Sequence, residues 1–329
     1  MDSSERINRF DNLKGIAIML IVLGHMTFLT SFTSVGLIHN FVYIIHLPIF
    51  FFVACYFSKI GPDEPIKAFK RLFVPFVVFC IIYELFNLFI MGKPHNTMLF
   101  LNPGYALWFL FSLFTMKLLL PILNKFKYPI LTAFIVALLI GYIDAVLLGI
   151  SRTCTFLPIF LIGFYYNELK EKIGVKYNKI SNLLENNLFI IFLFIITISC
   201  CIIAAYFLPF DAILLKNPYK THSVSNMVIR SIILILGGSN ALLLNRLMTN
   251  NKNILTKIGK NSMSVYLLHV YIVVLIRPLM KPYFSHHEKL FIIAAIIITF
   301  IIVFVLSRDF VAKGVNKLTD SVFKLINNY

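Results

Sequence analysis

Apolar residues in this chain come in long runs that repeat along its whole length, and the polar residues gather in short stretches between them. Many runs are close to the roughly 20 residues that a helix needs to cross a hydrocarbon core. The strict alternation of apolar and polar positions that marks the strands of a membrane barrel is missing. The pattern therefore predicts an all-α, polytopic membrane helical bundle of about ten transmembrane helices.

The connectors between the runs are too short to fold as separate globular domains. We therefore expect residues 1–329 to form a single transmembrane domain. The spans are expected near residues 12–30, 39–58, 72–92, 105–124, 128–149, 152–168, 188–208, 224–245, 262–280 and 289–308.

Basic residues are distributed unevenly over these connectors. With the amino terminus inside, most of the 30 Lys and Arg residues fall on one side of the membrane, and Lys117, Arg230 and Arg277 fall within spans. An excess of Lys and Arg marks cytoplasmic loops. The arrangement predicts a multi-pass protein of the plasma (cytoplasmic) membrane with both termini in the cytoplasm.

The composition limits the classes of partner. Hydrophobic residues make up 59% of the chain and charged residues only 13%, whereas soluble domains average about 25% charged residues. The formal net charge of +16 is spread over separate loops that face one leaflet. Membrane lipid is therefore the expected partner, and nucleic acid is not. The five cysteines lie within apolar runs without metal-ligand spacing, so no metal is expected.

Three ionisable groups are expected at one depth in the membrane. An ionisable side chain in hydrocarbon costs several kcal/mol, so each one calls for a partner, a water-filled cavity or a function. At ~1.5 Å per residue, His25, His46 and Glu84 lie at similar heights above the basic residues at the inner ends of their helices. Two interpretations stay open: the groups satisfy one another across helices, or they form a functional centre.

A second polar layer is expected nearer the outer face. Trp108 has an alternative role as an interfacial anchor, and Arg277 has one as a side chain that extends outward to water. Asp11 precedes His25 by fourteen residues, or roughly 21 Å of helix, so direct contact is excluded. We expect Asp11 to cap the first helix or to pair with Lys14. The outer layer comprises Trp108, Asp144, Arg152, Arg230 and Arg277.

Several separate blocks follow one another in a fixed order along the chain: residues 9–18 (RFDNLKGIAI) with Gly24 and His25, 46–52 (HLPIFFF), 70–76 (KRLFVPF), 107–110 (LWFL), 151–152 (SR), 156–164 (FLPIFLIGF), 259–262 (GKNS) and 266–269 (YLLH). In this order the blocks resemble the acyltransferase-3 family of integral membrane acyltransferases, and especially its fucose 4-O-acetylase-like branch. Lys67, Lys70 and Arg71 stand near the place where that family often has paired arginines.

The resemblance implies an O-acetyltransferase that moves an acetyl group from cytoplasmic acetyl-CoA to a hydroxyl of a cell-envelope glycan or lipid-linked sugar, in a bacterium. It implies that His25 is catalytic, and Glu84 or His46 is expected to orient its imidazole. Acetyl-CoA is expected as donor substrate, with no metal. Its anionic end is expected at Lys14, Lys67, Lys70 and Arg71, and the acceptor at Trp108, Arg152, Asp144 and Arg277.

Two other functions compete with acyl transfer. A transporter or flippase for a glycan would also place charges inside the membrane, but the pattern ending at Gly24 and His25 is not repeated in the second half of the chain. A purely structural role leaves the midplane histidines and Glu84 unexplained. We expect no further domain after the last span, so the enzyme would act alone or with separate envelope-biosynthesis proteins.

Overall fold

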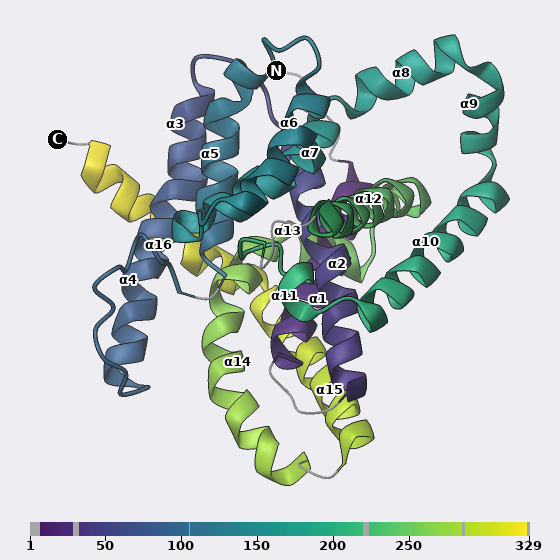
Figure 1. Cartoon of the computed structure of the whole chain (residues 1–329). Helices are drawn as coiled ribbons and strands as arrows, with labels where there is room; N and C mark the ends of the chain where they lie inside the picture. The colour runs from purple at the N-terminus through teal and green to yellow at the C-terminus, as the bar shows by residue number, and fades with distance from the viewer. Residues whose placement is uncertain (1–6, 29–32, 105, 220–223, 285–286, 328–329) are drawn as a thin grey trace. The chain divides into compact units, whose positions relative to one another are not determined.

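The computed structural model describes residues 7–28, 33–104, 106–219, 224–284 and 287–327 (Figure 1). These residues form helices joined by short connections and contain no strand, which confirms the all-α prediction for this part of the chain. The chain divides into two compact units, each assembled from segments that are distant in sequence. The first unit comprises residues 1–53, 165–208 and 233–312, and the second comprises 54–164, 209–232 and 313–329.

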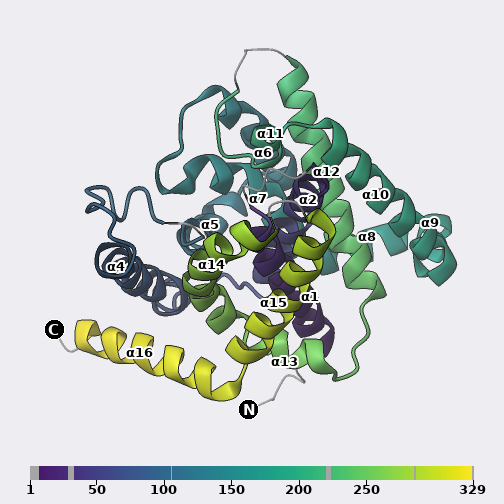
Figure 2. The same ribbon diagram turned by 90° about the horizontal axis from the view of Figure 1, so that it is seen from below.

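The first unit combines the two helices that begin the chain with helices from its second half. Its α14 and α15 lie side by side in Figures 1 and 2. Helix α2 ends in the second unit, and α12 begins there. The helices are α1 (Asn8–Met26), α2 (Thr33–Tyr56), α8 (Tyr166–Lys176), α9 (Asn178–Glu185), α10 (Asn187–Phe207), α12 (Val224–Leu247), α13 (Ile254–Lys260), α14 (Ser262–Phe284) and α15 (Glu288–Leu306).

The second unit is built mainly from the chain between α2 and α8. Its α6 and α7 pack together. One continuous helical stretch contains a π-helical turn, η1, which carries Lys70 and Arg71. The elements are α3 (Glu64–Ala68), η1 (Phe69–Phe73), α4 (Val74–Phe89), α5 (Trp108–Leu123), α6 (Pro129–Leu139), η2 (Ile140–Tyr142), η3 (Leu147–Gly149), α7 (Ile150–Phe164), α11 (Phe210–Ile213) and most of α16 (Asp309–Asn327).

Seven helical segments in the described chain are long and apolar enough to cross a membrane, and each coincides with a predicted span. Helices occupy the other three predicted positions as well. However, α5 and α6 are shorter, and α1 carries Arg9, Asp11 and Lys14 near its start. A total of about ten spans and the side of each terminus stay predictions. The seven are Ser34–Tyr56, Glu64–Phe89, Leu147–Phe164, Asn187–Phe207, Val224–Leu247, Ser262–Met280 and Glu288–Leu306.

Helix α1 is held against α13 by a backbone contact that glycine makes possible. A Cβ atom at Gly259 would overlap the carbonyl oxygen of Asp11, and one at Gly15 would lie 2.5 Å from the carbonyl oxygen of Leu255. Packing this close leaves no room for a side chain on either helix at these positions. The start of α1 is therefore fixed by main-chain contact with α13.

A buried asparagine reinforces the same contact. The Asn12 side chain donates hydrogen bonds to the carbonyl oxygens of Thr249 at 2.9 Å and Asn251 at 3.1 Å, and it accepts one from Thr256 Oγ1 at 2.6 Å. Asn12 is fully buried, so an unpaired amide there would be costly. The sequence blocks at residues 9–18 and 259–262 thus meet in one structural joint.

Replacing Gly259 by alanine tests this joint. We expect Gly259→Ala to lower the free energy of unfolding by about 1–3 kcal/mol, because overpacking against a backbone atom cannot be relieved by a side-chain rotation. The measurement is the thermal unfolding midpoint of the purified protein in detergent, followed by circular dichroism.

Gly314→Ala in α16 is the matched control, because a Cβ atom there meets nothing within 4 Å. An alanine in an exposed helix is expected to gain about 0.5–1 kcal/mol over glycine. Equal midpoints for the two variants would contradict the proposed close contact.

Candidate functional site

A stripe of polar aromatic side chains runs along one side of α2. His39, Tyr43 and His46 are separated by four and three residues, which places them on one helix face. A Cβ atom at Gly24 would lie 3.1 Å from Val42 Cγ1 and 3.3 Å from the Tyr43 ring. Gly24 therefore lets the end of α1 approach this face of α2 closely.

His25, in the last turn of α1, faces the stripe. Its Nδ1 lies 3.5 Å from the Tyr43 hydroxyl, and its ring stacks on His269 of α14 with centroids 5.3 Å apart and an interplanar angle of 21°. His269 is fully buried, whereas His25 is partly exposed. We refer to His25, His39, Tyr43, His46 and His269 as the histidine cluster; all five belong to the first unit.

Three rings of the cluster are oriented by main-chain carbonyl groups. The acceptors are Gly24 for His39 Nδ1 at 2.8 Å, Val42 for His46 Nδ1 at 2.7 Å, and Val265 for His269 Nδ1 at 2.9 Å. A carbonyl oxygen can only accept, so each of these rings donates its Nδ1–H. A neutral ring in this tautomer keeps the lone pair of Nε2 available as an acceptor or a base.

Tyr43 lies at the centre of the cluster. Its ring centroid is 4.4 Å from that of His39 and 4.9 Å from that of His46. Its contact with His25 is at the long end of hydrogen-bonding distance, as catalytic contacts often are before substrate binds. His25 and His46 are the two histidines expected at one depth in the membrane. They are connected indirectly, through Tyr43.

Arg277 of α14 lies next to the same centre. Its Nη1 donates to the carbonyl oxygen of His25 at 3.5 Å, and its guanidinium lies 5.6 Å above the Phe28 ring. Within the described residues, no group of three or more His, Cys, Asp or Glu side chains is arranged to hold a metal ion. Together with Arg277, the histidine cluster brings imidazole, phenol and guanidinium groups to one place.

Glu84 lies in the second unit, on α4. Its buried carboxylate accepts hydrogen bonds of 2.7 Å from His95 Nδ1 and from the backbone N–H of Asn96. Glu84 therefore anchors the connection between α4 and α5. Its expected role in orienting His25 stays a prediction.

The basic residues expected at the donor end are largely paired with carboxylates. Lys14 contacts Asp11 at 2.7 Å, which confirms the predicted pairing of these two residues. The other two ion pairs join Lys67 to Glu64 at 2.8 Å and Lys70 to Asp320 at 3.0 Å, whereas the Arg71 side chain is exposed.

Two of the residues expected to contact the acceptor meet in the second unit. The Arg152 guanidinium lies 3.8 Å from the centroid of the Trp108 ring, a cation–π geometry. Burial, together with the nearby Arg152 charge, lowers the pKa of Lys216 below its usual value. Asp144 is exposed, in the connection between η2 and η3. Trp108 is 6% exposed, so the Arg152 guanidinium packs on a buried ring.

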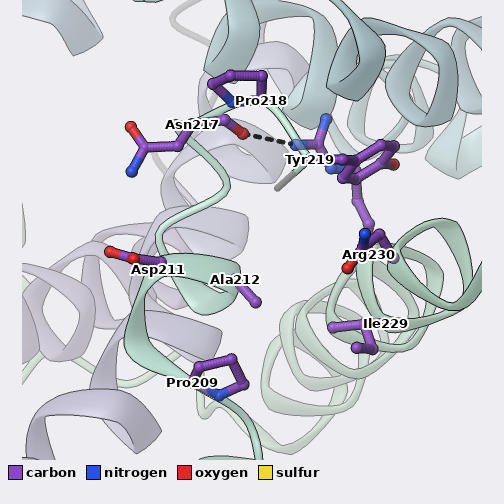
Figure 3. Close-up of a pocket in the computed structure, with 9 residues that line it drawn as sticks. Pro209, Asp211, Ala212, Asn217, Pro218, Tyr219, Ile229 and Arg230 are labelled. Carbon is purple, nitrogen blue, oxygen red and sulfur yellow. Dashed lines mark hydrogen bonds between the residues drawn. The ribbon is translucent and has the colours of Figure 1, made fainter. Parts of the chain in front are cut away.

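Arg230 serves as a structural tie at the edge of a pocket (Figure 3). Its guanidinium donates to Ala137 O at 3.2 Å, Thr155 Oγ1 at 3.2 Å and Asn217 O at 3.5 Å, and it lies 4.7 Å from the Tyr219 ring centroid. Burial raises the pKa of Tyr219. These contacts join α6, α7 and α12 to the connection before α12.

The pocket beside Arg230 has a volume of about 550 Å³, including its open mouth. Pro209, Ala212 and Ile229 form an apolar wall, and Asp211 lies at its rim (Figure 3). All residues that line it belong to the second unit. The space inside it that is comparable to a cavity is about 100 Å³.

Three members of the cluster, His39, Tyr43 and His269, are not among the site residues predicted from the sequence. The spacing of His39, Tyr43 and His46 was a usable signal, because polar side chains on one face of an apolar helix indicate a shared environment. The stacking of His25 on His269 depends on how α1 and α14 pack, and no local pattern gives that information.

Comparison with known families gives one match: the model of the acyltransferase domain aligns with residues 7–308. The matched region includes every residue of the histidine cluster and ends two residues after α15. Comparisons with curated proteins and with solved structures give no significant match.

The structural role of Arg230 can be measured by substitution. We expect Arg230→Met to lower the free energy of unfolding by at least about 2 kcal/mol, because hydrogen bonds from a charged donor are lost and buried acceptors are left unpaired. The readout is again the thermal midpoint in detergent.

Arg246→Met provides the comparison within the same helix. Arg246 makes a single, more exposed hydrogen bond of 3.1 Å to Glu185 O, so its loss is expected to change stability by less than about 1 kcal/mol. If Arg230→Met is no less stable than Arg246→Met, Arg230 is not a structural tie.

Proposed function

The chain belongs to the acyltransferase domain family, and from this premise we propose that it is a membrane O-acetyltransferase. The proposed reaction moves an acetyl group from acetyl-CoA to a hydroxyl of a cell-envelope glycan or a lipid-linked sugar. The observation that supports it best is the position of His25: a half-buried residue whose ring lies next to the Tyr43 hydroxyl and stacks on His269.

His25 is proposed as the general base. If the Tyr43 hydroxyl accepts a hydrogen bond from Nδ1–H of His25, Nε2 is the nitrogen that takes the proton of the acceptor hydroxyl. The acceptor oxygen then forms a bond to the acetyl carbon while the carbon–sulfur bond of the thioester breaks. The proton passes from His25 to the CoA thiolate, so the products are the acetyl ester and free CoA.

The neighbours of His25 have proposed positioning roles. His46 and His39 hold the Tyr43 ring from two sides, so they act on His25 through Tyr43. Glu84 is proposed as a second orienting residue. Arg277, whose guanidinium lies beside the backbone of His25, is placed to bind the acceptor or the negative charge that develops on the acetyl oxygen.

The donor is proposed to bind through Lys14, Lys67, Lys70 and Arg71. Ion pairs of exposed side chains contribute only about 0–1 kcal/mol, so CoA phosphates can replace the carboxylates that contact Lys67 and Lys70. Lys70 and Arg71 lie in a π-helical turn, a feature that is frequent at functional sites. Arg71 is exposed and adds a guanidinium fork suited to phosphate.

The acceptor is proposed to lie against the Trp108 ring, with Arg152, Asp144 and Arg277 as hydrogen-bonding groups. An indole face suits the apolar side of a sugar, and the neighbouring cations suit anionic substituents. We place the enzyme in the cytoplasmic membrane of a bacterium, alone or with separate envelope-biosynthesis proteins. Among the described residues, no contact favours the transport alternative.

Substitution of His25 tests the chemistry. We expect His25→Ala to reduce acetyl transfer by about 10²–10⁴-fold, the range for a lost general base. Tyr43→Phe is expected to cause a smaller loss, because it removes the orienting hydroxyl and keeps the base. The assay compares, by mass spectrometry, the acetyl content of envelope glycans from cells that carry each variant.

His287→Ala is the matched control, since His287 is an exposed histidine at the start of α15. It is expected to retain full activity, and all variants are compared at equal membrane expression. A fully active His25→Ala enzyme would remove this residue from the mechanism.

A further inference from the structure

Helix α16 begins directly after a predicted span and lies outside the residues matched by the family model. Ser307 and Arg308 separate it from α15. At this break Asn261 Nδ2 donates 2.7 Å hydrogen bonds to Ser307 O and Asp309 Oδ1, and Ser264 Oγ donates to Leu306 O at 2.8 Å. The helix therefore starts from a fixed point at the end of a membrane-spanning segment.

One side of α16 packs against protein. Val315 and Thr319, four residues apart, are buried. Further along, Asp320 pairs with Lys70 at 3.0 Å, and the Phe323 ring lies 6.4 Å from that of Phe69. These contacts fix the rotation of the helix about its axis and leave the opposite side outward.

The outward side joins an apolar strip to a basic strip. Leu318 and Leu325, seven residues apart, are 43% and 64% exposed. Next to them, Lys313, Lys317 and Lys324 share another exposed strip, because spacings of four and seven residues return to one side of a helix. A helix with apolar residues beside lysines is suited to the boundary between headgroups and acyl chains.

We propose that α16 lies in the plane of the membrane surface and binds anionic lipid of the leaflet at which α15 ends. Leu318 and Leu325 enter the acyl boundary, and the three lysines contact lipid phosphates. Lipid is the occupant that fits, because the helix continues from a span and so begins at this boundary. A second copy of α16 would instead bring like-charged lysine strips close together.

The depth of single tryptophans tests the proposal. Trp108 is the sole tryptophan of the chain, so Leu325→Trp is made in a Trp108→Phe background and the full-length protein is reconstituted in vesicles of phosphatidylcholine and phosphatidylglycerol. Brominated acyl chains are expected to quench Leu325→Trp at least about twofold more than a control, because an interfacial helix buries its apolar face about 5–10 Å.

The control is Asn316→Trp in the same background. Asn316 is exposed and is nine residues from position 325, which puts it on the opposite side of the helix. Equal quenching of the two tryptophans would overturn the proposal. So would quenching of Leu325→Trp that appears only on dilution of the protein in the vesicles, which would indicate that a second copy covers this face of the helix.

A second arm tests the charge. Removing phosphatidylglycerol, or changing Lys313, Lys317 and Lys324 to glutamine together, is expected to weaken the quenching of Leu325→Trp. If neither the removal of phosphatidylglycerol nor the triple lysine substitution weakens the quenching, anionic lipid has no role in binding this helix. Neither arm measures acetyl transfer, so the result is separate from the fate of the proposed function.

Discussion

The backbone contact between α1 and α13 determines where the histidines of the first unit lie. Gly15 and Gly259 are each ten residues before a histidine of the stacked pair, His25 and His269. Because α1 is rigid, fixing its start at Gly15 fixes the position of His25 about 15 Å further along. Asn261 follows α13 directly and is held by hydrogen bonds to Ser307 and Asp309. It therefore fixes the start of α14, the helix that carries His269. A shift of either helix start would separate the two rings, so stability and chemistry depend on the same contact.

Buried polar groups in the two units are used in different ways. In the second unit, the two terminal nitrogens of the Arg230 guanidinium donate hydrogen bonds to Ala137, Thr155 and Asn217, and these bonds hold three segments of the fold together. In the first unit, three histidines of the cluster, His39, His46 and His269, direct Nδ1 to main-chain carbonyls, whereas Nδ1 of His25 lies next to the Tyr43 hydroxyl. A main-chain carbonyl that accepts from Nδ1–H orients the ring and engages only one of its two nitrogens. This difference in hydrogen-bonding capacity separates residues that support structure from residues able to perform proton transfer.

Local patterns predicted the local features of the molecule. The apolar runs predicted helices at all ten positions, and the spacing of three residues predicted the pair of Asp11 and Lys14. Because both residues are ionisable and lie at similar heights on their helices, His25 and His46 are expected near each other. In the structure Tyr43 lies between them. The pair of Glu84 and His95, and that of Trp108 and Arg152, depend on the paths of connections whose conformation no periodic pattern encodes. Packing between distant helices likewise decided the partner of His25.

The polar blocks that resemble the family thus need not all take part in the chemistry. Asn261 belongs to the block at residues 259–262, yet its amide holds the break between α15 and α16, and Gly259 in the same block admits the backbone of α1. A short segment can in this way fix two helices at once: the one that carries His25 and the one that follows the last predicted span. Its side chains lie at the joint rather than at the cluster, so substitutions there should act through the position of His25 and not through proton transfer itself.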